Sequence, residues 1–455
     1  MGCSTGTRGV SAPRALLVQP PVYDFALYDL ALHPYGLLRI GAWLEQSGYE
    51  ISLLDALDAY PSRPSTGRRK LRRVIVPRPA VFADVPRRYA RYGIDTAEIA
   101  DRLRAARPDV VLVTTGMTYW YEGLAEIASV LQAEIPGVPV VAGGIAATLM
   151  PAHTAEVLRT DSVIAGDAGA ERRLLDATLA SAGLPGLSGE LPVNPSLRAQ
   201  RESRRLRDAV ALRLHEGCRD RCVYCASRLL SPRFRAGDWR TTADRIREAA
   251  AAGIRTFAFY DDALLDGADS HLLPLLEWIV SRFGTRGLEL ILPNAIHLER
   301  LTPPVCDLLF RAGVREVRLG VESLDDDFHL AYDRKLRPAS VPGGVRMLRD
   351  AAFGRGMVAA YVLAGLPGQT ARSVRETVER LGELGVVPRV AEYSPVPGTA
   401  LYEAACDVSR YPLRSEPLCH NNSVFPTAGP EFTIDDLWSI KGVARELRKQ
   451  LAATG

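Results

Sequence analysis

Three cysteines, Cys218, Cys222 and Cys225, stand close together near the middle of the chain. Their C-x3-C-x2-C spacing places three thiolates on one short loop, which can hold three corners of a cubane iron–sulfur cluster. Gly217, directly before the first thiol, lets the backbone turn sharply. No fourth cysteine follows at ligand spacing, so one iron is expected to stay open. An open iron can bind and reduce another molecule.

Zinc binding and disulfide bonding are the alternative uses of these thiols. A zinc site usually takes four protein ligands in paired spacings, and only His215 lies nearby, on the strand side of the loop. Disulfides need an oxidising compartment, and no secretory signal is recognisable at the start of the chain. The seven cysteines therefore indicate a reducing, cytoplasmic location, and an iron–sulfur cluster is the favoured prediction.

The cysteine spacing, with Tyr224 immediately before the last cysteine, resembles the radical S-adenosylmethionine (radical SAM) superfamily. The resemblance implies that the open iron of a 4Fe–4S cluster binds the amino and carboxylate groups of S-adenosylmethionine (SAM). It also implies that one electron cleaves SAM to a 5′-deoxyadenosyl radical. A reductant such as a flavodoxin or ferredoxin is the expected partner.

Strands and helices alternate after the cysteines and predict a partial (β/α)6 barrel over 208–400. Barrel chemistry takes place at the carboxyl ends of the strands, and each expected strand ends in a polar or Gly/Pro cluster. Asn294 and His297 are expected at the same mouth, as candidate substrate contacts. The expected strands are 209–214, 256–260, 288–292, 316–321, 358–363 and 389–393.

The resemblance also implies which strand ends contact SAM. Where the superfamily often has Gly-Gly-Glu against the methionyl amino group, this chain has Tyr260-Asp261-Asp262. An acidic pair still accepts hydrogen bonds from an ammonium. Capping of the following helix is the alternative role for Asp261 and Glu322. The further contacts implied are Tyr224 beside the cluster, Glu322 and Ser323 at the fourth strand, Gly365 and Pro367 at the fifth, and Ser394 and Pro395 at the sixth.

Strands and helices also alternate over 13–181, which predicts a doubly wound, Rossmann-like parallel sheet. No G-x-G-x-x-G follows the first strand, so a nicotinamide cofactor is not expected. Ligands bind at the carboxyl ends of such strands. The expected strands are 14–18, 50–54, 109–114, 139–142 and 162–165, and the candidate ligand contacts at their ends are Thr115, Gly116, Gly143, Gly144 and Gly166.

Placed before a radical SAM unit, this first unit resembles a cobalamin-binding domain, through residues 34–38, 143–148 and 166–171. Many such domains carry D-x-H-x-x-G, whose histidine ligates cobalt, and this chain has no such motif. The resemblance therefore implies base-off cobalamin without a histidine ligand. His33 and His153 are expected to be surface or loop residues.

Three segments outside the two units differ in composition. Residues 1–12 are predicted to be a disordered lead-in, and 182–207 a linker between the units. The insertion 63–92 within the first unit holds ten Lys or Arg and one acidic residue, Asp84. It is either a solvated loop that covers a sheet edge or a lid whose arginines meet a phosphate.

The C-terminal extension, 401–455, is expected to end in an amphipathic helix over 435–451. Thr433 or Asp435 is the expected N-cap of that helix. The extension also carries one further cysteine and a Cys-His pair; the pair has no partner at ligand spacing, so a structural or substrate-facing role is expected for it. These residues are Cys406, Cys419 and His420.

Taken together, the resemblances predict a cobalamin-dependent radical SAM enzyme. It would abstract hydrogen from an unactivated carbon of an organic substrate and then transfer a methyl group from methylcobalamin. Radical oxidation, cyclisation or ring rearrangement without methylation is the alternative, and a cluster- or cobalamin-binding sensor a more distant one. The net charge of +3 disfavours a nucleic-acid binder, and the chain contains no apolar run long enough to span a membrane.

Overall fold

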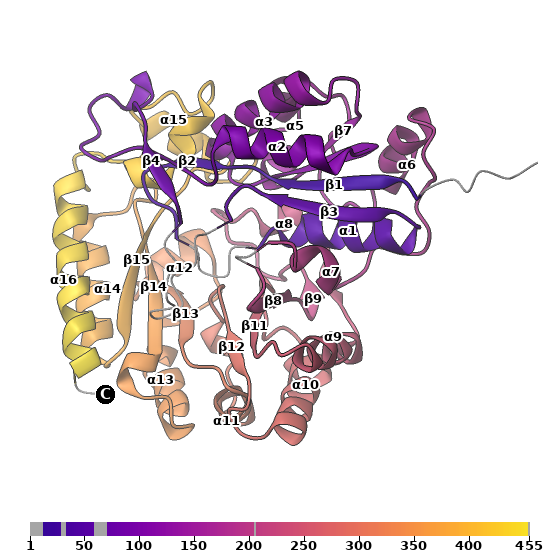
Figure 1. Cartoon of the computed structure of the whole chain (residues 1–455). Helices are drawn as coiled ribbons and strands as arrows, with labels where there is room; N and C mark the ends of the chain where they lie inside the picture. The colour runs from indigo at the N-terminus through magenta and orange to yellow at the C-terminus, as the bar shows by residue number, and fades with distance from the viewer. Residues whose placement is uncertain (1–11, 29–32, 59–70, 204–205, 454–455) are drawn as a thin grey trace, which may run out of the picture.

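The structure is a computed structural model that describes residues 12–28, 33–58, 71–203 and 206–453 (Figure 1). The predicted lead-in, apart from its last residue, and residues 63–70 of the basic insertion lie outside the described residues. Two α/β units lie against one another, the first at the top of Figure 1 and the barrel below it. Across the described parts of the chain, no helix combines the length and the apolar character needed to cross a membrane.

The first unit follows the predicted alternation of strands and helices. Its first helix has the predicted bounds, and Gly48 just beyond it has a φ of 89°, the left-handed conformation that glycine supplies at helix ends. The elements of this unit are β1 (Arg14–Gln19), β2 (Val22–Asp24), α1 (Tyr35–Gln46), β3 (Glu50–Asp55), β4 (Arg73–Ile75), η1 (Ala80–Phe82), β5 (Ala90–Tyr92), α2 (Thr96–Ala106), β6 (Val110–Thr115), η2 (Thr118–Trp120), α3 (Tyr121–Glu134), β7 (Val140–Gly144), α4 (Ile145–Leu149), α5 (Pro151–Leu158) and α6 (Arg172–Ser181).

The main sheet of the first unit is parallel, in the order β3-β1-β6-β7. Successive residues of β1 face opposite sides: Ala15 and Leu17 join the core beneath α1 and α6, and Leu16 joins the core beneath α2, α3 and α5. Helices therefore cover both faces, and the doubly wound prediction is confirmed. The expected fifth strand is reduced to one bridge between Ala142 and Val163.

Strands β4 and β5 of the basic insertion pair with β2 in an antiparallel sheet of order β2-β5-β4. The three residues of β4 are exposed. Arg91 is buried and binds Glu126 through two nitrogens, and Arg87 donates to the Ser423 carbonyl oxygen at 2.7 Å. Arg87 and Arg91 thus contact protein groups, and Arg88 is exposed.

The second unit contains six parallel strands at the predicted places. They form two three-stranded sheets, β12-β11-β8 and β13-β14-β15. Two single bridges connect these sheets, one between residues 290 and 314 and one between residues 296 and 319. One continuous core fills this partial barrel. Its elements are β8 (Ala209–Leu212), α9 (Trp239–Ala251), β11 (Thr256–Phe259), α10 (Ala268–Phe283), β12 (Glu289–Ile291), η3 (Leu298–Arg300), α11 (Pro303–Ala312), β13 (Val317–Glu322), α12 (Asp326–Tyr332), η4 (Pro338–Ser340), α13 (Val341–Asp350), η5 (Arg355–Met357), β14 (Val358–Ala364), α14 (Ala371–Glu383) and β15 (Val387–Glu392).

The C-terminal extension returns to cover both units (Figure 1). Its last helix packs on α14, where Gly382 leaves room for the Leu447 side chain. Thr433 and Asp436 exchange side-chain to backbone hydrogen bonds at the start of that helix, which confirms Thr433 as the cap. The remaining elements are α7 (Leu197–Gln200) in the linker, the hairpin strands β9 (His215–Glu216) and β10 (Arg235–Ala236), α8 (Ser227–Leu230), α15 (Tyr402–Val408), η6 (Pro417–His420), η7 (Asn422–Val424) and α16 (Ile434–Ala453).

Candidate active site

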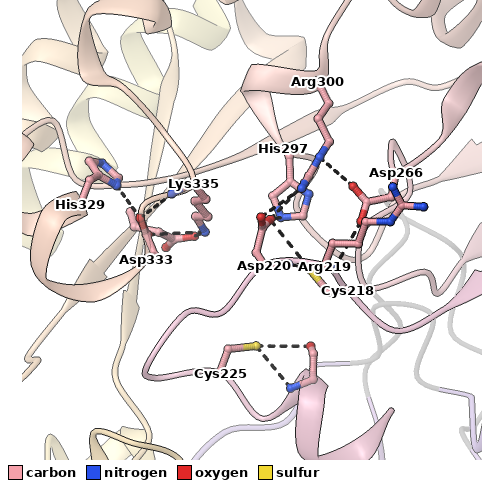
Figure 2. A network of polar contacts seen from close by, with 12 residues as sticks. Cys218, Arg219, Asp220, Cys225, Asp266, His297, Arg300, His329, Asp333 and Lys335 are labelled. Atoms are coloured by element: carbon pink, nitrogen blue, oxygen red, sulfur yellow. Dashed lines mark hydrogen bonds and ion pairs between the residues drawn. The ribbon is translucent and has the colours of Figure 1, made fainter. Parts of the chain in front are cut away.

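The three cysteines lie on the loop between β9 and α8, which we call the cysteine loop. Figure 2 shows Cys218 and Cys225 on this loop. Gly217 turns this loop with a φ of 80°, and a Cβ atom there would lie 2.9 Å from the Arg233 carbonyl oxygen. Glycine is therefore required at this close approach. All three thiols are free: Cys218 and Cys222 are half-buried and Cys225 is exposed.

Backbone amides point at two of the three sulfur atoms. The N–H of Asp220 donates to Cys218 Sγ and the N–H of Ser227 donates to Cys225 Sγ, each at 3.4 Å. Hydrogen bonds of this kind support negative charge on the sulfur ligands of a cluster. Three free sulfur donors on one loop, two of them with amide support, fit three corners of a 4Fe–4S cluster.

Burial controls the protonation of the free thiols. It raises the pKa of Cys218 to about 11 and the pKa of Cys222 to about 12. At Cys222 the strongest opposing effect is the ammonium of Lys335, which lowers the thiol pKa. Both thiols are therefore protonated at neutral pH in the free protein, and binding of a metal must release their protons.

A cluster of charged side chains holds the first half of the cysteine loop (Figure 2). Arg300 donates to both oxygens of Asp220, at 3.1 and 3.0 Å, and its Nε lies 2.7 Å from Asp266 Oδ1. His297 Nε2 lies 3.2 Å from Asp220 Oδ2, and burial lowers the pKa of His297 to about 4. His297 was expected at the mouth of the barrel. Asp220, Asp266 and Arg300 were not candidates, although Asp220 stands between two cysteines in the sequence.

A second polar network lies behind the other half of the cysteine loop. The Tyr224 hydroxyl donates to Asp333 Oδ2 at 2.9 Å, and His329 Nδ1 lies 2.7 Å from Asp333 Oδ1. Lys335 Nζ donates to Glu322 Oε1 at 2.8 Å and lies 4.0 Å from Asp333 Oδ2. Tyr224 and Glu322 were candidate site residues from the sequence. The structure places both in one network with Asp333, His329 and Lys335, which were not candidates.

The fourth-strand candidates differ in how they are held. Glu322 has a φ of 64°, beside a register shift in β13; such left-handed backbone is rare outside glycine and gathers at functional sites. The Ser323 hydroxyl accepts from the Asp325 N–H at 3.1 Å and so serves the turn. Helix α12 is capped by Asp325, so the alternative that Glu322 caps it is wrong.

Tyr260, at the second strand end, is directed into the junction between the units. Its hydroxyl accepts from the His33 N–H at 2.8 Å, and its ring centroid lies 5.8 Å from that of Tyr35. His33 Nε2 lies 3.2 Å from the Ala209 carbonyl oxygen. His33 is a loop residue, as predicted, but it is buried there.

Asp261 is buried beneath the exit of β8. Its Oδ1 accepts from the N–H groups of Leu214 and His215, both at 2.9 Å, and its Oδ2 has no hydrogen-bond partner. Burial raises the pKa of Asp261 to about 6. The next residue, Asp262, is half-buried. Helix α10 begins after Gly267 instead, so the alternative that Asp261 caps it is wrong.

Neighbouring side chains hold the fifth strand end. Gly365 has a φ of 91°, and a Cβ atom there would lie 2.2 Å from the Phe425 ring. The Pro367 carbonyl oxygen accepts from the Tyr332 hydroxyl at 2.8 Å. Packing therefore requires Gly365, whatever else approaches this turn.

The C-terminal extension also holds the sixth strand end. The Ser394 hydroxyl donates to the His420 carbonyl oxygen at 2.6 Å, and Pro395 is buried. His420 is fully buried, with Nδ1 2.9 Å from the Thr118 hydroxyl of the first unit. Cys419 is also buried. Of the two expectations for this pair, the structure supports the structural one.

Small residues form the carboxyl edge of the first sheet. The Thr115 hydroxyl donates to the Gly143 carbonyl oxygen at 3.0 Å and accepts from the Ala147 N–H at 2.8 Å. A Cβ atom on Gly144 would lie 2.4 Å from the Thr115 carbonyl oxygen. Gly166 has a φ of 99° and open space where a Cβ atom would stand.

The packing of neighbouring residues requires glycine at only some positions of this edge. A Cβ atom on Gly116 would meet the Trp120 ring at 2.4 Å, so Gly116, like Gly144, is fixed by its neighbours. At Gly143 the atom nearest to an added Cβ would lie 4.0 Å away, and at Gly166 no atom would lie within 4 Å of an added Cβ. Packing therefore does not explain the glycines at 143 and 166, and the carboxyl edge of such a sheet is where ligands bind.

Comparison with known families agrees with both halves of this arrangement. A family model described as the radical SAM superfamily matches residues 212–381, and one described as the B12 binding domain matches residues 83–175. The chain is a radical SAM protein with a B12-binding domain. Its fold class, a Rossmann-like unit before a partial barrel, is the one predicted.

Solved structures with the same architecture cover nearly the whole chain. One is the radical SAM methyltransferase TsrM from Kitasatospora setae, with tryptophan substrate and the SAM analogue aza-SAM bound. It is 19% identical with a TM-score of 0.65, and the match covers 94% of this chain and 89% of that one. Another is the cobalamin-dependent SAM radical enzyme OxsB with aqua-cobalamin and SAM bound, at 13% identity, a TM-score of 0.57, and coverage of 96% and 61%. At these identities the likeness shows the fold.

A curated relative matches a shorter stretch of this radical SAM protein. The ribosomal protein uS12 methylthiotransferase RimO of Heliobacterium modesticaldum (strain ATCC 51547 / Ice1) is 24% identical over 185 residues. The match spans 38% of this chain and 38% of that relative. It therefore spans well under half the length of that relative.

The B12-binding and radical SAM units meet beside the cysteine loop. Helix α4, which follows the Gly143–Gly144 edge, packs against α8, which follows the last cysteine. On the hairpin that flanks the cysteine loop, Arg235 forms ion pairs with Glu216 and with Asp167 of the B12-binding unit. The carboxyl edge of the first sheet and the cysteine loop therefore lie at one junction between the units.

Proposed function

We propose that this chain is a cobalamin-dependent radical SAM enzyme that transfers a methyl group to an unactivated carbon of an organic substrate. The observation that carries the proposal is the contact between α4 and α8, which sets the edge of the B12-binding unit beside the cysteine loop. When bound, the cluster and SAM supply a 5′-deoxyadenosyl radical that abstracts hydrogen, and cobalamin supplies the methyl group. The protein positions these groups and excludes water and oxygen.

In this proposal Cys218, Cys222 and Cys225 each give one thiolate to the 4Fe–4S cluster and leave one iron for SAM. Asp262 and Glu322 offer carboxylate oxygens at neighbouring strand ends, which suit the methionyl ammonium. Asp261 acts indirectly, because its Oδ1 holds the backbone between β8 and the cysteine loop. The other proposed SAM contacts are Tyr224, Tyr260, Gly365, Pro367, Ser394 and Pro395, whereas Ser323 is assigned to the turn before α12.

Cobalamin is proposed to bind base-off, without a histidine ligand, at the edge formed by Thr115, Gly116, Gly143, Gly144 and Gly166. The positions of two histidines support this form. His33 contacts Tyr260 in the junction, and the His153 ring stacks edge-on against Tyr121, with centroids 4.9 Å apart.

The proposed division of the chain follows from these roles. Residues 13–181 form the cobalamin-binding unit, 182–207 the linker, 208–400 the radical SAM unit and 401–455 the extension. The substrate is an organic molecule with an unactivated C–H bond; TsrM, which shares the fold, has been solved with tryptophan. A one-electron reductant such as a flavodoxin or ferredoxin supplies the electron.

Anaerobic production with hydroxocobalamin, followed by reconstitution with iron and sulfide, tests the proposal. We expect about four irons and about one cobalt per chain, and formation of 5′-deoxyadenosine when SAM and reductant are added. The triple Cys→Ala variant of the cysteine loop should lose both the iron and the deoxyadenosine. Cys406→Ala, which removes a half-buried cysteine in the extension, is the matched control and should keep both.

The product distinguishes the two radical outcomes. With SAM labelled in its methyl group, a labelled mass gain of one methyl group on the substrate supports methyl transfer. Loss of hydrogens without the label would replace methyl transfer by oxidation or cyclisation. Deoxyadenosine formed by the triple Cys→Ala variant would contradict the radical SAM assignment of the site.

A further inference from the structure

A buried lysine stands behind the cysteine loop (Figure 2). The Lys335 side chain is 9% exposed, and its ammonium is bonded to Glu322 at 2.8 Å. Burial lowers the pKa of Lys335, but Glu322, Cys222 and Asp333 outweigh that effect and hold the pKa above its ordinary range. Lys335 is therefore a permanent positive charge in a nearly dry part of the site.

The ammonium lies close to the backbone of β13. Residue 320 of β13 is glycine, and a Cβ atom there would lie 3.4 Å from both Lys335 Nζ and Glu322 Oε1. On the other side, Nζ lies 5.9 Å from the centre of the Tyr224 ring, within reach of a cation–π contact. The charge is thus fixed between β13 and the second half of the cysteine loop.

This charge lies beside the segment that carries two of the proposed cluster ligands. The Tyr224 ring, 5.9 Å from Lys335 Nζ, belongs to the residue between Cys222 and Cys225, and the Tyr224 hydroxyl donates to Asp333, whose Oδ2 lies 4.0 Å from Nζ. A charge in a low-dielectric setting acts more strongly than the same charge in water. The position of Lys335 therefore favours additional negative charge at the cysteine loop.

We propose that Lys335 sets the reduction potential of the iron–sulfur cluster held by the cysteine loop, an inference that rests on the proposed function. Reduction adds one electron from a one-electron donor and takes up no proton, so the site becomes more negative by one charge. No bond forms or breaks in that step. Because nearby charge tunes cluster potentials, the Lys335 ammonium stabilises the reduced cluster and makes it easier to reach.

The test is a dithionite titration of the reconstituted holoprotein, followed by electron paramagnetic resonance. Lys335→Met should lower the equilibrium constant for reduction about tenfold, which is about 59 mV for a one-electron couple. Lys335→Arg keeps the charge and should stay within about threefold of the wild type. Lys441→Met is the matched control, because it removes a lysine from another carboxylate, Glu392, at the end of β15; it should not move the potential.

A second variant keeps the test decisive if Lys335→Met cannot hold a cluster. Asp333→Asn removes a negative charge from the same network and should shift the potential in the opposite, positive direction. An unchanged potential in Lys335→Met with full iron content, or a negative shift in Asp333→Asn, would overturn the inference alone. A wild-type protein without iron and sulfide would instead overturn the proposed function.

Discussion

Arg235 on the hairpin of the radical SAM unit forms an ion pair with Asp167 of the B12-binding unit. The same guanidinium binds Glu216 at 2.7 Å, and Glu216 also binds Arg39 on α1. Glu216 is 12% exposed and therefore stands as one shielded carboxylate between two arginines from different units. This row of charges fixes the hairpin that flanks the cysteine loop.

Replacing the central carboxylate should loosen the junction. Glu216→Gln keeps the shape but leaves two arginines without their shared anion, and we expect a loss of about 1.5–3 kcal/mol in the free energy of unfolding. Urea unfolding measures this loss. Arg414→Gln breaks exposed pairs with Glu403 and Asp407 and should cost less than about 1 kcal/mol. Equal losses in the two variants would contradict a special role for Glu216.

Two adjacent glycines should respond differently to the same substitution. Gly144→Ala forces a Cβ atom against the Thr115 carbonyl oxygen at a φ of 108°, so we expect a loss of about 1–3 kcal/mol in stability. Gly143→Ala meets no close atom and should leave thermal unfolding nearly unchanged while lowering cobalamin binding. Unfolding curves and the cobalamin absorbance of the purified variants check both expectations. Full cobalamin content in Gly143→Ala would move the proposed cobalamin contact away from this residue.

Asp261 should make stability depend on pH. Its folded pKa of about 6 lies above the value of about 4 expected for an unfolded chain, so the folded protein holds this proton more tightly. The contribution of this carboxyl is complete below about pH 4 and is lost as the pH rises through about 6. The gap between the two pKa values corresponds to about 3 kcal/mol.

Asp261→Asn removes this titration. The stability of the variant relative to the wild type should therefore rise by about 3 kcal/mol between about pH 4 and about pH 7.5, measured by urea unfolding. His215 has its pKa lowered to about 4 by burial, so its contribution changes in the opposite direction, and because its Nδ1 lies 3.2 Å from Asp261 Oδ1 the comparison measures the two groups together. A difference that does not vary with pH would show that Asp261 is not held as described.

Substitutions at the neighbouring residues Glu322 and Ser323 should distinguish a side chain that binds SAM from one that only supports the local fold. Glu322→Gln should weaken SAM binding at least about tenfold, or about 1.4 kcal/mol, because it removes the carboxylate charge opposite the methionyl ammonium. Ser323→Ala should change SAM affinity less than about threefold, since that hydroxyl serves the Asp325 turn. Isothermal titration calorimetry on the reconstituted protein measures both. The reverse order of effects would assign the contact to Ser323.

Local patterns in the sequence were enough to predict the cysteine loop and the parallel strands. Each depends on residues close together in the chain, such as Gly217 before Cys218, or on the alternation of apolar strand and helix. The antiparallel sheet β2-β5-β4 was missed, because Tyr23 and Arg91 pair across a long separation and prolines around them suggested irregular structure. Register between distant segments leaves no periodic signal in one sequence.

The polar support of the site was missed for the same reason. Tyr224 and Asp333 are 109 residues apart in the chain, and nothing in the spacing of either predicts their hydrogen bond. Tyr260 shows the limit of assigning strand ends by resemblance: its position is at the mouth, but its hydroxyl contacts His33. The left-handed backbone of Glu322 likewise follows from a bulge in β13 and not from any local preference of glutamate.

The extension that closes on the B12-binding unit has a consequence for synthesis of the chain. His420 reaches Thr118 across 302 residues, and Asn421 reaches Asp24 across 397. At about 5–20 residues per second, a ribosome needs roughly 15–60 s to add the residues between Thr118 and His420. During that interval the nascent first unit lacks the segment that covers this side. The contacts that the extension supplies to the first unit can therefore form only after the barrel has been translated.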